Sequence, residues 1–109
     1  MPSPTQRSLD LMRKRGFTVQ VVEKWIPQAR RRVDLFGFGD VIAMHPESGT
    51  VLVQTTSASN MAARVKKISA EPRHRTWLLA GRGWHRIEVH GWRKDKTGKW
   101  VCRTVEVGL

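Results

Sequence analysis

The chain has 109 residues, which is enough for one domain and too few for two. Its hydrophobic residues make up 39% of the composition, enough to build a core, and this excludes a wholly disordered chain. The 20 lysines and arginines against 9 acidic residues give a formal charge of +11. Such a charge opposes compaction by self-repulsion and therefore favours a polyanionic partner. Nucleic acid is the commonest partner of this kind, with an anionic membrane surface as the rival.

Targeting signals and zinc-binding spacings are both missing from the sequence. No stretch approaches the ~20 continuous apolar residues that cross a bilayer, and residues 1–6 lack the apolar region of a signal peptide. We therefore expect a cytoplasmic protein, of phage, mobile-element or bacterial type, with no membrane partner. The single Cys102 excludes an internal disulfide, and the four histidines show no zinc-ligand spacing with it.

The N-terminal half predicts a helix followed by strands. Ser3 can cap a helix from Pro4 to Arg15, with Gln6 closing the capping box, and Gly16 ends it. Residues 17–23 alternate like a strand. The stretch 24–32, which contains Pro27 and three successive arginines, reads as an exposed loop. Residues 33–44 read as a strand whose beginning is flexed by glycines, and a turn at 46–49 makes residues 50–56 its hairpin partner.

The C-terminal half predicts two helices and two strands. Met61, Val65 and Ile68 recur at helical spacing and form one buried stripe. A further helical piece runs from Pro72 to Gly81. Residues 84–92 read as a half-buried strand, and a turn at 95–98 leads to a last strand over 100–107. The fold class is therefore α/β (α+β), in the order α-β-β-β-α-(α)-β-β, with a central mixed sheet flanked by helices in one domain.

The segment with chemistry is the hairpin that carries Asp40, Gln54 and Thr56. Asp40 precedes the apolar triplet 41–43 on one strand, while Gln54 and Thr56 lie two apart on the next and so share a face. The hairpin brings Asp40 near Gln54. Oxygen ligands gathered in this way suit a hard cation such as Mg²⁺ or Mn²⁺.

This layout resembles the PD-(D/E)XK nuclease superfamily, with Holliday-junction-resolvase-like and VRR-NUC-like members as the nearest groups. In that family a helix and a strand precede an Asp-bearing strand, and a hairpin turn leads to a strand with Glu-x-Lys before a second helix. Asp40 matches the family's Asp, and Gln54-Thr55-Thr56 occupies the place of Glu-x-Lys. The resemblance covers about residues 9–68. It implies a restriction-endonuclease-like core and metal-assisted hydrolysis of phosphodiesters.

The same resemblance implies roles for further residues. Glu23 would match the family's upstream acidic residue, although many members carry it in the first helix, where only Asp10 is available. Asp40, Gln54, Glu23 and a Thr55 backbone carbonyl would then hold Mg²⁺ or Mn²⁺. Asp34 is a further carboxylate, and a β-bulge at residues 37–39 would decide on which face of the strand its side chain lies.

Two positions depart from the family pattern. Gln54 brings an amide oxygen where the family has a carboxylate, which lowers the expected affinity for a metal. Thr56 replaces the lysine that orients the attacking water and offsets phosphate charge, and a hydroxyl cannot supply that charge. Lys67 or Arg64 on the following helix could replace it.

The basic residues indicate where nucleic acid would bind. Arg30, Arg31 and Arg32 read as phosphate contacts or as a solvated basic run. A stripe of Asn60, Arg64 and Lys67 reads as a second nucleic-acid contact or as a wet helix face. Among the five tryptophans, only Trp25 beside the arginines suggests base stacking; Trp77 reads as core, and Trp84, Trp92 and Trp100 as residues that clamp the sheet.

Three functions follow from these patterns. The first is a metal-dependent DNA nuclease that acts on branched or nicked DNA; such nucleases commonly dimerise to cut two strands, which would make the protein a homodimer. The second is a catalytically inactive nucleic-acid-binding module on the same fold. The third, a basic adaptor for an acidic protein, explains the charge but not the hairpin.

Overall fold

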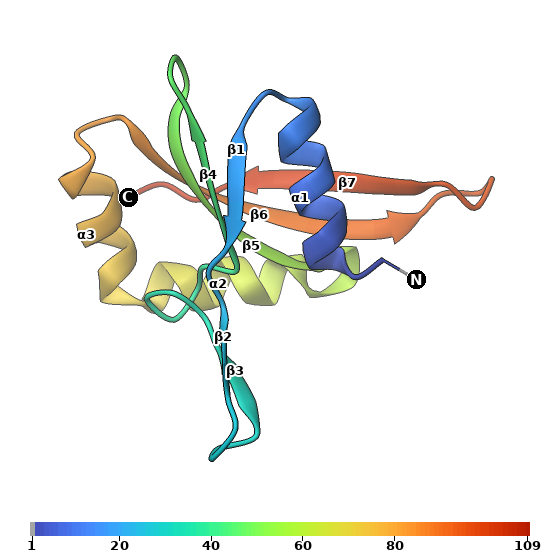
Figure 1. Ribbon diagram of the computed structural model, residues 1–109, viewed down its shortest axis with the longest axis horizontal. Coiled ribbons are helices and arrows are strands. Elements are labelled where there is room, and N and C mark those ends of the chain that lie inside the picture. The colour runs from blue at the N-terminus through green and yellow to red at the C-terminus, as the bar shows by residue number, and fades with distance from the viewer. Residues whose placement is uncertain (1) are drawn as a thin grey trace.

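A computed structural model describes residues 2–109 as a mixed α/β fold with a five-stranded sheet and three helices (Figure 1). The elements, in chain order, are α1 (Pro4–Lys14), β1 (Thr18–Val21), β2 (Lys24–Ile26), β3 (Arg31–Val33), β4 (Val41–His45), β5 (Gly49–Ser57), a 3₁₀ turn (Ala58–Asn60), α2 (Met61–Ala70), α3 (Pro72–Ala80), β6 (His85–Lys94) and β7 (Trp100–Glu106).

The main sheet has the strand order β1-β4-β5-β6-β7. Its strands pair antiparallel except for β5 and β6, which run parallel. A parallel pair needs a crossover connection, and α2 and α3 provide it. Strands β2 and β3 form a separate two-stranded ribbon, inserted between β1 and β4, which projects away from the main sheet (Figure 1).

Helix α1 begins and ends as the sequence predicts. The Ser3 hydroxyl accepts a hydrogen bond from the Gln6 backbone N–H at 3.1 Å, and Gly16 follows the helix with φ +90°. The predicted capping box is not closed, because the Gln6 side chain donates to Asp10 one turn later instead. The apolar face of the helix packs Leu9 and Met12 onto one side of the sheet, against Phe17, Val41, Ala43, Val51 and Val53.

The opposite side of the sheet forms a second core. Leu52 of β5 points to this side because successive strand residues alternate, and it packs with Met61 and Ile68 of α2. The predicted stripe of Met61, Val65 and Ile68 is therefore confirmed. With α1 on one face and α2 on the other, both faces of the central strands are covered.

The prediction of a loop at 24–32 and of a strand beginning at residue 33 is wrong. Lys24–Ile26 pairs with Arg31–Val33, because Pro27 lies in the turn, where its missing N–H interrupts no ladder. Asp40 directly precedes β4, which starts only at Val41. A tight turn precedes it, with Phe36 and Gly37 at φ 55° and 82°.

Strand β6 is more deeply buried than predicted. Its polar residues Glu88 and His90 are 4% and 0% exposed, because α1 covers the face on which they lie. The tryptophans also differ from the prediction. Trp92 is buried, but Trp84 and Trp100 are 60% and 37% exposed and do not clamp the sheet.

Within residues 2–109, no helix has both the length and the apolar character that crossing a membrane requires.

Candidate active site

The hairpin of β4 and β5 brings Asp40 against Gln54, as the sequence predicts. The Asp40 Oδ2 atom accepts hydrogen bonds from Gln54 Nε2 at 2.6 Å and from the Thr55 backbone N–H at 2.8 Å. The Thr55 hydroxyl donates to the same oxygen at 3.2 Å. Asp40 is only 4% exposed. Its carboxylate is therefore held in one orientation by the neighbouring strand.

Two further carboxylates join Asp40. Glu23 and Asp34 each offer an oxygen within 4.8 Å of the others and of Asp40, and we call these three residues the acidic cluster. Glu23 directly precedes β2 and Asp34 directly follows β3, so the ribbon brings both to the cluster. The alternative residue in the first helix, Asp10, lies instead 3.5 Å from Arg13 on the exposed side of α1.

The negative charges of the acidic cluster are not fully balanced by nearby positive charges. Burial raises the pKa of Asp40 to about 8, and a hydrogen bond with Asp34 and the negative charges of Asp34 and Glu23 push it in the same direction. The hydrogen bond from the Thr55 backbone lowers this pKa but does not offset the other effects. A carboxyl with this pKa retains a proton at neutral pH, and a nearby cation would favour the ionised form.

A buried oxygen without a hydrogen-bond partner lies beside the acidic cluster. Gln54 is 3% exposed, and while its Nε2 donates to Asp40, its buried Oε1 has no hydrogen-bond partner. Leaving a buried acceptor unpaired costs about 1–3 kcal/mol. Three carboxylates and an amide oxygen form the all-oxygen donor set that Mg²⁺ or Mn²⁺ prefers, so the residues present fit such an ion.

The acidic cluster opens into a pocket of about 550 Å³. Its lining residues come from α1, β1, the ribbon, β5 and α2: Ser3, Pro4, Thr5, Gln6, Leu9, Val21, Glu23, Arg32, Asp34, Asp40, Gln54, Thr55 and Arg64. The Thr5 and Thr55 hydroxyls lie 3.0 Å apart and fix the first turn of α1 beside the cluster. The positive end of the α1 dipole therefore faces a site suited to a phosphate.

Only some of the predicted basic residues line this pocket. Arg32 and Arg64 line it, and Arg32 Nη1 lies 3.1 Å from Glu23 Oε1. Lys67 is exposed on α2 and is not among the lining residues, so Arg64 is the better placed substitute for the motif lysine. Thr56, at the motif lysine's position, is buried and does not line the pocket either. The remaining predicted contacts, Arg30, Arg31 and Asn60, are exposed.

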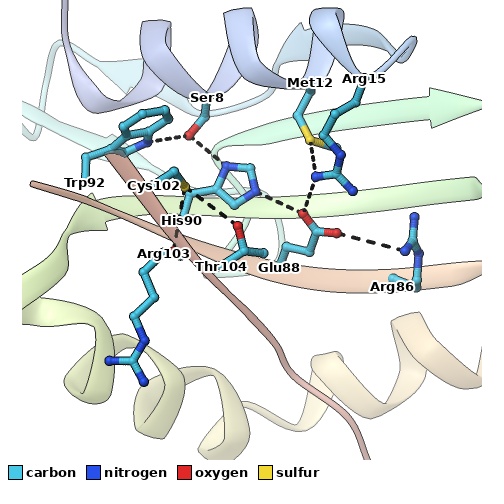
Figure 2. A network of polar contacts seen from close by, with 10 residues as sticks. All are labelled: Ser8, Met12, Arg15, Arg86, Glu88, His90, Trp92, Cys102, Arg103 and Thr104. Atoms are coloured by element: carbon cyan, nitrogen blue, oxygen red, sulfur yellow. Dashed lines mark hydrogen bonds and ion pairs between the residues drawn. The ribbon is translucent and has the colours of Figure 1, made fainter. Parts of the chain in front are cut away.

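A second polar cluster lies between α1 and the sheet (Figure 2). His90 Nδ1 lies 2.9 Å from the Ser8 hydroxyl, and His90 Nε2 lies 2.9 Å from Glu88 Oε1. Trp92 donates to Ser8 and Arg15 donates to Glu88. We call these five residues the buried network. A chain of Ser, His and Glu has the order of a nucleophilic triad, but Ser8 and His90 are 0% exposed, so no substrate can reach the hydroxyl.

Two parts of the site were not found in the sequence. The sequence pattern assigns Asp34 no role beyond that of a further carboxylate, and it indicates a helix start at residues 3–6 but no part for that turn in the site. The paired segments Lys24–Ile26 and Arg31–Val33 were the available signal, because a hairpin there necessarily brings Glu23 and Asp34 together.

Comparison with known proteins gives no match: no protein family, no curated protein and no solved structure is similar to this chain.

Proposed function

We propose that this chain is a metal-dependent nuclease of the PD-(D/E)XK type that acts on DNA, with branched or nicked DNA as its preferred substrate. The observation that carries the proposal is the acidic cluster beside the unpartnered Gln54 Oε1, in a pocket that Arg32 and Arg64 also line. Ligands for a hard cation and groups for a phosphate thus occur at one place, which metal-assisted phosphodiester hydrolysis requires.

The order of the elements supports the finer assignment of a restriction-endonuclease-like core. Helix α1 and strand β1 precede Asp40 and β4, and the β4–β5 hairpin leads to α2. Strand β6 then returns parallel to β5. This order agrees with the α-β-β-β-α-β arrangement proposed for that core, with the ribbon as an insertion between its first two strands and with α3 and β7 as additions.

In the proposed site, Glu23, Asp34, Asp40 and the Gln54 amide oxygen hold Mg²⁺ or Mn²⁺. The bound ion would lower the pKa of a coordinated water and neutralise charge on the phosphate. The protein's own part is orientation. Thr55 fixes the Asp40 carboxylate through its backbone N–H and hydroxyl. The Thr55 carbonyl remains a predicted ligand.

The phosphate would be bound by groups on the other walls of the pocket. Arg64 extends from α2 and takes the electrostatic role of the missing motif lysine. The first turn of α1 adds the positive end of its dipole. Lys67 stays a predicted alternative from the exposed part of α2.

One observation favours a second function, an inactive nucleic-acid-binding module on the same fold. The described residues that line the pocket include two arginines but no lysine, and Thr56 contributes no charge. An arginine holds a phosphate well but is a poor proton donor or acceptor, because its guanidinium group stays protonated in proteins. This module would bind DNA with a steep salt dependence and would not cleave it.

Cleavage assays with the full chain separate these functions. Supercoiled plasmid and a four-way DNA junction are incubated with Mg²⁺ or Mn²⁺, using the wild type, Asp40→Ala and Asp10→Ala. Asp10 is the matched control because it is an acidic residue on the exposed side of α1, outside the pocket. We expect cleavage by the wild type and Asp10→Ala and none by Asp40→Ala.

Undiminished cleavage by Asp40→Ala would refute the proposed site. DNA binding without cleavage by the wild type would select the inactive module. Calorimetric titration with Mn²⁺ provides a readout that does not depend on activity: the wild type and Asp10→Ala should bind the ion, and Asp40→Ala should not.

A further inference from the structure

The ribbon (residues 24–33) is a projecting element that carries exposed apolar side chains. It projects from the body beyond the edge of the main sheet (Figure 1). Trp25 and Val33 on it are 52% and 40% exposed. An isolated two-stranded ribbon is only marginally stable in water. Val33 pairs with Lys24 and Trp25 with Arg32, so the two apolar side chains lie on opposite faces of the ribbon, and Trp25 is the larger exposed group that a partner would cover.

The charge of the ribbon identifies the class of partner. Its ten residues include Lys24, Arg30, Arg31 and Arg32 and no acidic residue. Four cations on a short exposed element favour a polyanion. Trp25 adds a flat apolar surface, which suits a partner that presents bases or thymine methyl groups beside its phosphates.

The register of the ribbon connects it to the acidic cluster. Trp25 pairs with Arg32, so both side chains lie on one face of the ribbon. The next pair of residues on that face, toward the body, is Glu23 and Asp34. The ion pair of Arg32 with Glu23 at 3.1 Å is consistent with this. A nucleic acid that lies along this face therefore reaches the acidic cluster at the root of the ribbon.

The dimensions of the ribbon select the groove that it fits. About five residues separate the root from the tip, which corresponds to ~17 Å at ~3.4 Å per residue. The B-DNA major groove, about 12 Å wide and 8.5 Å deep, admits a two-stranded ribbon without deformation, whereas the minor groove, about 6 Å wide, must first be widened at a cost in free energy. The deep and narrow major groove of A-form RNA excludes side chains.

We propose that the ribbon enters the major groove of a B-form DNA duplex and thereby places one of the phosphates that border the groove at the acidic cluster. The inference rests on the proposed function, since it names how that same site takes its substrate. The arginines contact phosphates on both sides of the groove, and Trp25 contacts base edges. Binding by the ribbon therefore selects duplex DNA over duplex RNA.

A shortened ribbon tests this inference. Residues 25–32 are replaced by Asn-Gly, which joins Lys24 to Val33 through a two-residue hairpin turn and keeps their register. This variant loses three arginines and leaves Glu23 and Asp34 in place. The control is the triple variant Arg93→Ala, Lys96→Ala and Lys99→Ala, which removes three exposed cations from β6 and the turn before β7.

Affinity is measured for a short DNA duplex and for an RNA duplex of the same sequence, without divalent ions. Relative to the control, we expect the shortened ribbon to weaken DNA binding by at least about tenfold more, a difference of about 1.4 kcal/mol. RNA binding should fall by a similar factor in both variants, because only the lost charge matters there. The double variant Trp25→Ala/Arg31→Ala, which keeps the ribbon, should show part of the same DNA-specific loss.

Equal losses of DNA affinity in the shortened and control variants would overturn the role of the ribbon. So would a loss that is the same for DNA and RNA. In both cases the wild type still binds DNA, and the proposed function stands. Failure of the wild type to bind any of these nucleic acids would refute the proposed function itself. Thermal melts of each variant establish that it is folded, and the double variant provides the test if the shortened ribbon does not fold.

Discussion

The acidic cluster lies beside the first turn of α1 and the buried network lies between α1 and the sheet, and their charges are balanced in opposite ways. In the buried network, burial by itself raises the pKa of Glu88, yet the hydrogen bonds from His90 and Arg15 outweigh it and lower this pKa to about 2. In the acidic cluster, the main influences on Asp40 within residues 2–109 are burial and the neighbouring Asp34 and Glu23 rather than a cation, and its pKa rises to about 8.

The two regions also differ in which buried polar atoms lack a hydrogen-bond partner. Each side chain of the buried network is hydrogen-bonded within it (Figure 2). Among the described residues, the buried atom without a hydrogen-bond partner near this network is Arg86 Nε, a donor. Beside the acidic cluster, the buried atom without a hydrogen-bond partner is an acceptor, Gln54 Oε1. Excess negative charge and a free oxygen indicate a binding site, whereas balanced charge and paired atoms indicate a structural element.

The largest effect that we expect on stability comes from Glu88→Gln. This change keeps the side-chain shape but removes the charge that pairs with Arg15 and His90. We expect the free energy of unfolding to fall by about 3 kcal/mol, since breaking a buried pair leaves its partners uncompensated. Urea denaturation of the wild type and the variant at neutral pH measures this loss. A loss below about 0.5 kcal/mol would show that the network does not stabilise the fold.

The matching change in the acidic cluster, Asp40→Asn, should have the opposite sign. It removes a buried negative charge beside Asp34 and Glu23, while the amide oxygen can still accept from Thr55. Above pH 8, without divalent ions, we expect the melting temperature to rise by about 5 °C or more. Differential scanning calorimetry measures it. A lower melting temperature would mean that the Asp40 charge stabilises the fold, and the contrast between the two regions would fail.

The variant Gln54→Glu tests the same contrast through the affinity of the site for a metal ion. A carboxylate here would match the motif of the proposed family, but it adds a fourth carboxyl group beside the acidic cluster. Without an ion the variant should be less stable than the wild type, and its affinity for Mn²⁺ should rise by about tenfold, equivalent to ~1.4 kcal/mol. Calorimetric titration at fixed pH measures the affinity, with the neutral Gln54→Met as a control that should bind more weakly. Unchanged Mn²⁺ affinity in both variants would place the ion elsewhere.

The smallest effect concerns pH. Glu88 has a folded-state pKa of about 2 against an ordinary value of 4.5, so it stabilises the fold at pH values above 4.5 and this contribution is lost as the pH falls through 2. The stability difference between the wild type and Glu88→Gln should therefore shrink steadily between these two pH values. Denaturation curves of both proteins across that interval measure it, and the general repulsion of a +11 chain cancels in the difference. A constant difference would contradict the lowered pKa.

Local sequence patterns predicted most of the elements because their causes are local. The cap at Ser3, the stop at Gly16 and the turn at 46–49 depend on residues close in the chain, and each is present. The approach of Asp40 to Gln54 follows from the same hairpin. The ribbon was missed because Pro27 and the arginines resemble a loop, and only the pairing of Lys24–Ile26 with Arg31–Val33 distinguishes the two.

By itself, the sequence determined the basic charge, the α/β class and the hairpin with Asp40 and Gln54, because composition and short-range spacing are sufficient for these. The tertiary structure decided which charges are compensated. Glu88 and His90 belong to an alternating strand that predicts a solvated face, and only the packing of α1 over it encloses them. Likewise, Glu23 and Asp34 join Asp40 only through the pairing of the ribbon. Burial and long-range pairing fix the electrostatic environment of a carboxyl group, and neither can be read from its immediate neighbours in the chain.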